Sequence, residues 1–137
     1  MRKVGRDRMA ARERIEASLA GHLQSVLDDL RAAGIDGLSP LEPLSRMYAG
    51  DIWGMQPGWV LMGGIDASHL LAFGTEDDVR AAVRATLRDA AAEGRLWLGS
   101  STEIHPAIPA ANVLAMWDEA LRCGCYDGAS PGGGACW

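Results

Sequence analysis

The sequence predicts an α/β protein built on a parallel sheet, and two kinds of segment indicate it. Short apolar runs, at residues 59–65 and 96–99, end in glycine or polar residues, as is typical of strands that are buried on both faces. Longer segments lie between them, and their apolar residues recur every three or four positions, the period of an amphipathic helix. Strands and helices that alternate in this order form parallel sheets with right-handed crossovers.

The first predicted element is a helix over residues 8–33. Gly34 follows it, at a position where helix ends favour glycine. A very short buried strand is expected next, in the stretch "IDGLSPLEP", which closes at Pro40 and Pro43. The glycines and the proline between residues 50 and 58 then predict a loop. The helix prediction rests on one apolar stripe: Ile15, Leu19, Leu23, Val26, Leu27 and Leu30.

The second half continues with the strand "WVLMGGID" and a helix that begins after Thr75. Thr75 and Asp78 have the spacing of a capping box, in which each side chain accepts a backbone N–H of the other. Val79, Val83, Leu87 and Ala90 form the expected inner stripe of this helix. A strand over 96–99 and a helix from Asn112 to Leu121 complete the order. The inward side chains predicted for the last helix are Val113, Met116, Trp117, Ala120 and Leu121.

Composition limits the classes of function. The chain has 137 residues, about one domain, and a formal charge of −5, which argues against nucleic acid as its main partner. No segment has the length of apolar sequence that a membrane span or a signal peptide needs, so we expect a cytoplasmic protein. Cys123, Cys125 and Cys136 form neither a disulfide framework nor a standard zinc motif, and we expect a reduced tail.

Three segments resemble one family. Their residues, order and spacing are similar to the carboxyl-terminal part of proteins of the uroporphyrinogen decarboxylase superfamily. The segments are "VLDDLRAAGIDGLSPLEP", "WVLMGGIDASHLLAFGTEDDVRAAVRATL" and "LWLGSSTEIHPAIPAANVLAMWDEALRCG". The resemblance covers residues 23–124. It implies a partial (β/α)8 TIM barrel: the last three strand–helix units, with an added N-terminal helix. Residues 1–22 would be a charged helical extension atypical of the family, and residues 125–137 a flexible tail rich in glycine and cysteine.

The resemblance implies decarboxylation of a tetrapyrrole polycarboxylate in porphyrin biosynthesis, with no metal or organic cofactor. One alternative is a fragment of a corrinoid-linked methyltransferase of the same superfamily. A closed barrel needs eight strands and about 250 residues. We therefore expect an incomplete, truncated barrel that is inactive alone, and a non-catalytic remnant that self-associates is the other alternative. The expected partners are a tetrapyrrole or a methyl donor and, for the uncovered surface, a second copy or a complementary barrel piece.

Barrel enzymes place their sites beyond the carboxyl ends of the strands. Here that location holds residues 39–43, 63–69 and 99–106. Asp66 would bind a ligand or fix its turn, and Glu42 would bind a cation, transfer a proton or fix its loop. His105 would donate a proton or be anchored to a backbone carbonyl. The substrate-binding candidates are Glu42, Arg46, Asp66, Ser101, Thr102 and His105.

The sequence also departs from the family pattern. An "S-H-x-I" pattern is common in similar proteins, and here it reads "STEI", with Thr102 in the histidine position. No cysteine precedes Cys123, so the zinc-ligand segment of the methyltransferases is not matched. A polycarboxylate needs several cations, but Arg46 alone is expected near the active face. Three further arginines are expected on the outer face of the helix after Thr75: Arg80, Arg84 and Arg88.

Overall fold

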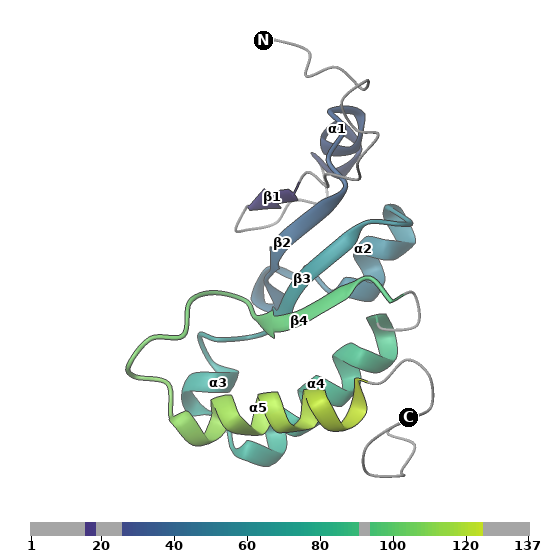
Figure 1. Cartoon of the computed structure of the whole chain (residues 1–137). Coiled ribbons are helices and arrows are strands. Elements are labelled where there is room, and N and C mark those ends of the chain that lie inside the picture. Colours follow the sequence, from purple (N-terminus) through teal and green to yellow (C-terminus); the bar gives the residue numbers. More distant parts are fainter. Residues whose placement is uncertain (1–15, 19–25, 91–93, 125–137) are drawn as a thin grey trace.

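The computed structural model describes residues 16–18, 26–90 and 94–124. Within them, four parallel strands form one sheet in the order β1-β2-β3-β4 (Figure 1). The pairing of β3 with β4 runs from Leu61 opposite Leu96 to Ile65 opposite Ser100. The predicted parallel alignment of these two segments is therefore confirmed. The bounds of the strands are β1 Glu16–Ser18, β2 Gly37–Leu41, β3 Val60–Ile65 and β4 Leu96–Ser100.

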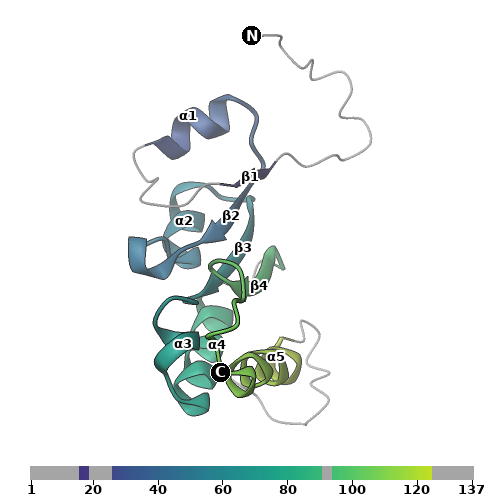
Figure 2. The ribbon, with the colours of Figure 1, turned by 90° about the vertical axis from the view of Figure 1, so that its left-hand side faces the viewer.

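Helices connect the strands and cover one face of the sheet. Figure 2 shows α1 at the β1 end of the molecule and α5 at the opposite end. The predicted capping box at the start of α4 is present: the Asp78 N–H donates to Thr75 Oγ1 at 3.2 Å, and the Thr75 N–H donates to Asp78 Oδ2 at 3.0 Å. The bounds are α1 Leu27–Ala32, a 3-10 turn η3 Pro43–Ser45, α2 Ala49–Met55, α3 Leu70–Phe73, α4 Glu76–Ala90 and α5 Ala110–Cys123.

The long N-terminal helix predicted over residues 8–33 is wrong at residues 16–18 and is confirmed, among the described residues, only over 27–32. Residues 16–18 form β1, with Glu16 opposite Gly37 of β2, and the helix covers only 27–32. Pairing with the edge of the sheet overrides the local helical pattern, because propensity is a weak determinant beside tertiary contacts. The described sheet thus has four strands where three were expected. The proposed N-terminal extension and C-terminal tail lie largely outside the described residues.

A helix also replaces the loop predicted over residues 50–58. In α2 the side chains of Ala49 and Ile52 are buried in the core although Gly50 and Gly54 weaken the helix. A Cβ atom on Gly50 would lie 3.3 Å from the carbonyl oxygen of Asp89, so this glycine lets α2 approach α4 closely. Burial of the apolar side chains stabilises a helix that local sequence does not signal.

The core lies between the sheet and its helices. Leu38, Leu61 and Leu96 stand opposite one another on β2, β3 and β4, and all three are buried. The next row has a different environment: Met62 is half-buried, and Trp97, opposite it on β4, is 61% exposed. Side chains alternate between the two faces of a strand. One face of the sheet is therefore packed against helices and the other is open in the described part of the chain.

The inward face predicted for α5 needs correction. Met116 is buried and Val113 and Ala120 pack against the core, as expected, but Trp117 and Leu121 are 63% and 59% exposed. The buried face also carries a charged residue, Glu119, that the apolar pattern does not mark. This helix has two apolar faces, and hydrophobicity alone does not indicate which of them meets α4.

Candidate functional site

The carboxyl ends of β2, β3 and β4 meet at one edge of the sheet, because adjacent parallel strands end on the same side. Glu42 directly follows β2, Asp66 directly follows β3 and Ser101 directly follows β4. The structure therefore brings the three predicted segments to one rim, as expected. Whether a side chain on this rim is available to a ligand depends on its hydrogen bonds.

Both carboxylate oxygens of Asp66 accept backbone N–H groups. Oδ1 accepts from Ser68 at 2.8 Å and from His69 at 3.2 Å, and Oδ2 accepts from Leu70 at 3.2 Å. Ser68 and His69 lie in the turn before α3 and Leu70 is its first residue, so the carboxylate fixes the turn that leads into α3. Asp66 is mostly buried, and this geometry is the turn-fixing role considered for it.

Ser101 connects two loops of the rim. Its buried Oγ accepts the N–H of Ala67 at 3.2 Å, and its own N–H donates to the carbonyl of Ile65 at 2.7 Å. The segment after β4 is thereby attached to the segment after β3. The neighbouring Ser100 Oγ donates to the carbonyl of Thr102 at 2.7 Å, while the Thr102 side chain is exposed.

The remaining candidates form local contacts or face solvent. Glu42 Oε1 accepts the N–H of Leu44 at 3.1 Å and so caps η3. Arg46 follows η3 in the left-handed region, with φ 57°. His105 is exposed, and its Nδ1 accepts the N–H of Ala107 at 3.3 Å, so it is anchored to a backbone N–H rather than to the carbonyl expected.

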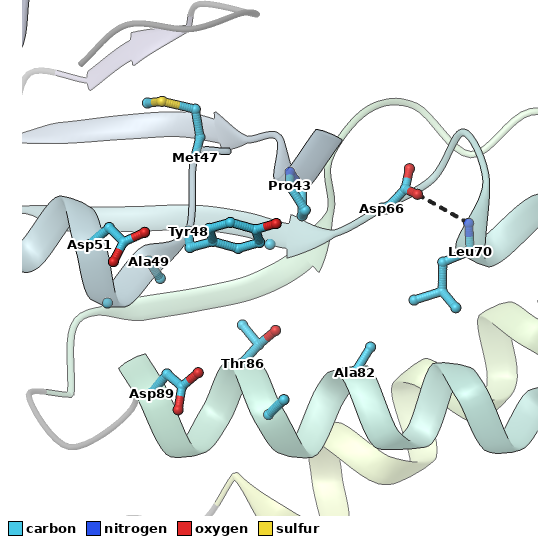
Figure 3. Close-up of a pocket in the computed structure, with 13 residues that line it drawn as sticks. Pro43, Met47, Tyr48, Ala49, Asp51, Asp66, Leu70, Ala82, Thr86 and Asp89 are labelled. Carbon is cyan, nitrogen blue, oxygen red and sulfur yellow. Dashed lines mark hydrogen bonds between the residues drawn. The ribbon is translucent and has the colours of Figure 1, made fainter. Parts of the chain in front are cut away.

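A cavity of about 540 Å³ lies beside the rim, between η3, α2, the end of β3 and α4 (Figure 3). Asp66 is the one predicted site residue that lines it. Asp51 and Asp89 are the other carboxylates of the wall, and the hydroxyls of Tyr48 and Thr86 also line it. Among the described residues that line it, none is a lysine or an arginine. Its chemistry favours neutral or cationic groups over a polycarboxylate.

Gly63 and Gly64 at the end of β3 shape this region. Their φ angles are 106° and 97°, values that glycine adopts without strain. A Cβ atom on Gly63 would lie 2.9 Å from the backbone nitrogen of Leu41, and one on Gly64 would lie 3.1 Å from Cγ2 of Thr86. The glycine pair thus allows close approach of β2 on one side and of α4 on the other.

Asn112 is one of three buried polar residues that sequence reasoning missed, together with Gln56 and Glu119. Its Nδ2 donates to the carbonyl of Leu71 at 3.0 Å and to that of Gly74 at 2.9 Å. The start of α5 is thereby held against the end of α3. Asn112 belongs to the resembling stretch "NVLAM", so its place in that motif was the available signal.

Glu119 on α5 was also missed, and only 2% of it is exposed. Its carboxylate accepts from Arg84 at 2.6 Å, lies 3.7 Å from Arg80 and accepts from Arg122. The hydrogen bond from Arg122, with that from Arg84, lowers the pKa of Glu119 although burial opposes the shift. Arg80 and Arg84 therefore face α5, and the prediction that they lie on the outer face of α4 is wrong.

Metal ligands do not gather in the part of the chain described by the structure. No three of its His, Cys, Asp and Glu side chains are arranged to hold a metal ion. Cys123 is disulfide-bonded, which corrects the expectation of a reduced thiol at this position. No helix among the described residues is long and apolar enough to span a membrane.

Comparison with known proteins agrees with the fold. A methyltransferase from Methanosarcina mazei has a similar structure, with a TM-score of 0.60 and 22% sequence identity. The similarity covers 79% of this chain and 31% of that chain, so this chain spans about a third of the matched protein. No curated protein is significantly similar in sequence. The family model for uroporphyrinogen decarboxylase (URO-D) matches residues 12–122, which include β1 and begin before the resemblance noted from residue 23. The chain belongs to the URO-D family.

Proposed function

We propose that this chain forms the carboxyl-terminal wall and rim of a URO-D barrel in which a tetrapyrrole polycarboxylate is decarboxylated. The observation that supports this role is the rim itself. Glu42, Asp66 and Ser101 follow three adjacent strands, and each accepts a backbone N–H within the rim. Such bonds fix the shape of the loops that border a site, and they leave these groups little capacity for proton transfer.

We expect most of the cations that the substrate requires to come from outside the described residues. A substrate with several carboxylates is bound by arginine or lysine. Arg80, Arg84 and Arg122 surround Glu119, away from the cavity wall, and Arg95 donates to the carbonyl of Gly58 at 2.8 Å. The chain alone is therefore expected to be inactive, and the remainder of a barrel supplies the reacting groups.

An assay of the purified chain tests this function. The chain alone is expected to release no carbon dioxide from uroporphyrinogen. A mixture with a URO-D barrel fragment that lacks its last four strand–helix units is expected to restore coproporphyrinogen formation. Turnover by the chain alone would contradict the division of roles. Methyl transfer from a corrinoid by the restored barrel, without decarboxylation, would instead favour the methyltransferase alternative.

A further inference from the structure

The cavity between α2 and α4 is separate from the interior of the barrel, because it lies on the helix-covered face of the sheet. Its volume of about 540 Å³ is within the range of about 300–1,000 Å³ that is usual for small-molecule sites. It exists because α2 has 7 residues and α4 has 15, so the shorter helix leaves part of α4 uncovered. In a (β/α)8 barrel these two helices follow consecutive strands and are neighbours in the outer ring. No strand or helix of the remaining barrel therefore comes between them.

Most of the wall of this cavity is apolar. On α4 the side chains that line it are small: Ala82, Ala85 and Thr86. Larger apolar groups come from Met47 and from Leu70, whose side chain points toward α4 (Figure 3). Small side chains on one wall and larger ones on the other leave room for the hydrocarbon part of a ligand.

The charged groups of the wall are carboxylates, and they lie at its two ends. Figure 3 shows Asp66 at the end beside α3, and it shows Asp51 and Asp89 at the opposite end. The ring of Tyr48 lies between the two ends. The backbone also brings the second pair together: a Cβ atom on Gly50, the residue before Asp51, would lie 3.7 Å from Cβ of Asp89. An aromatic ring and two carboxylates thus occupy one part of the wall.

The two ends differ in how far their negative charge is balanced. Asp66 accepts three backbone N–H groups. Asp51 forms no hydrogen bond or ion pair with another residue that the structure describes. Asp89 lies 3.7 Å from Arg88, but both side chains are exposed, so this ion pair contributes little. The end formed by Asp51 and Asp89 therefore attracts a cation, and the end formed by Asp66 does not require one.

We propose that this cavity binds a small organic cation, an alkylammonium or arylalkylammonium ion. Its ammonium group lies between Asp51 and Asp89, where it donates hydrogen bonds to the two carboxylates. The ring of Tyr48 adds a cation–π contact, which acts within about 6 Å. The hydrocarbon part extends along Ala82 toward Leu70, and its removal from water stabilises it there. An anion is disfavoured, because none of the described residues of the wall carries a positive charge.

Calorimetric titration of the full chain with phenethylamine tests the proposal. Phenethyl alcohol and phenylacetate, a neutral and an anionic probe of nearly the same shape, serve for comparison. We expect the amine to bind about five- to tenfold more tightly than the alcohol, which is what one cation–π contact and exposed ion pairs add together. Phenylacetate is expected to bind more weakly than either. In about 1 M sodium chloride the difference between amine and alcohol is expected to shrink, because salt screens exposed charges.

Three variants separate the charge of the site from its shape. Asp51→Asn keeps the size of the side chain and is expected to weaken binding of the amine about threefold, with the alcohol unchanged. Asp118→Asn is the matched control, because it removes the same charge from an exposed position on α5 outside the cavity, and it is expected to bind like the parent chain. Ala82→Leu fills the cavity and is expected to abolish binding of both probes. Circular dichroism establishes that each chain is folded, and if Ala82→Leu is not, the pair of asparagine variants decides.

Several results would overturn the proposal. They are equal affinity for the amine and the alcohol, and an Asp51→Asn variant that binds the amine like the parent chain. Each titration is repeated in the presence of the barrel fragment used in the assay above. Absence of binding in both conditions would mean that the cavity holds only water. Because none of these titrations requires turnover, their failure leaves the proposed decarboxylation untouched, and the two proposals are tested separately.

Discussion

Substitution of Asn112 is the most direct test of how α5 is held against the end of α3. In Asn112→Ala the carbonyls of Leu71 and Gly74 lose their donor at 3.0 and 2.9 Å. One net hydrogen bond contributes about 1 kcal/mol, and a buried group left without a partner costs about 1–3 kcal/mol. The Leu71 contact is buried and the Gly74 contact is partly buried, so the two bonds are not equal. The free energy of unfolding is expected to fall by about 2–4 kcal/mol.

Urea denaturation followed by circular dichroism measures this change. Asp118→Ala is the matched control, because Asp118 is an exposed residue on the same helix, and it is expected to shift stability by less than about 0.5 kcal/mol. Asn112→Asp removes both donors and brings a carboxylate to the two carbonyls, so its loss should be at least as large. A loss below about 0.5 kcal/mol for Asn112→Ala would show that the two bonds do not hold α5.

Three further substitutions test the ion cluster around Glu119, the turn that Asp66 fixes before α3, and the glycine pair. Glu119→Gln is expected to lower the free energy of unfolding by about 1–2 kcal/mol at pH 7, a value kept small because the arginines are partly exposed. The folded-state pKa of Glu119 lies below the ordinary 4.5. The stability difference between the parent chain and the variant is therefore complete above pH 4.5, and it shrinks as the pH falls through the folded-state pKa. An equal difference in urea titrations at every pH would contradict this reasoning. Asp66→Ala removes the acceptor of three N–H groups and is expected to cost about 1–2 kcal/mol in the same assay, with partial recovery in Asp66→Asn. An alanine variant of unchanged stability would argue against the turn-fixing role. Gly63→Ala, at φ 106°, is expected to lower the free energy of unfolding by about 2 kcal/mol or more, as measured by chemical denaturation. The control is Gly99→Ala, where a Cβ meets open space, and its free energy of unfolding is expected to stay within about 1 kcal/mol of the parent. Equal effects would refute the steric argument.

Elements with a strong local signal were predictable. The strand at 60–65 has an apolar run closed by two glycines, and α4 has both a stripe and a capping box that the structure contains. The parallel alignment of β3 and β4 followed from the strand–helix–strand order. These features depend on residues close together in sequence, where periodicity and capping act directly.

Elements stabilised by distant contacts were not predictable. Residues 16–18 form a strand because β2 offers its edge, and α2 forms although two glycines interrupt it. In the site, the sequence placed Glu42, Asp66 and Ser101 at one rim, but it left open whether Glu42 and Asp66 bind a ligand or accept backbone N–H groups. Those donors belong to turns whose backbone angles only the folded chain fixes.

The sequence by itself determined the α/β class, the family resemblance and the order of the rim segments, because each depends on local pattern. Only the tertiary structure decided which face of α5 is buried, and it placed Glu119 among three arginines while leaving Trp117 exposed. Hydrophobicity marks both of these faces as apolar. The choice between them depends on which surface meets α4, and that contact joins residues about 35 positions apart along the chain.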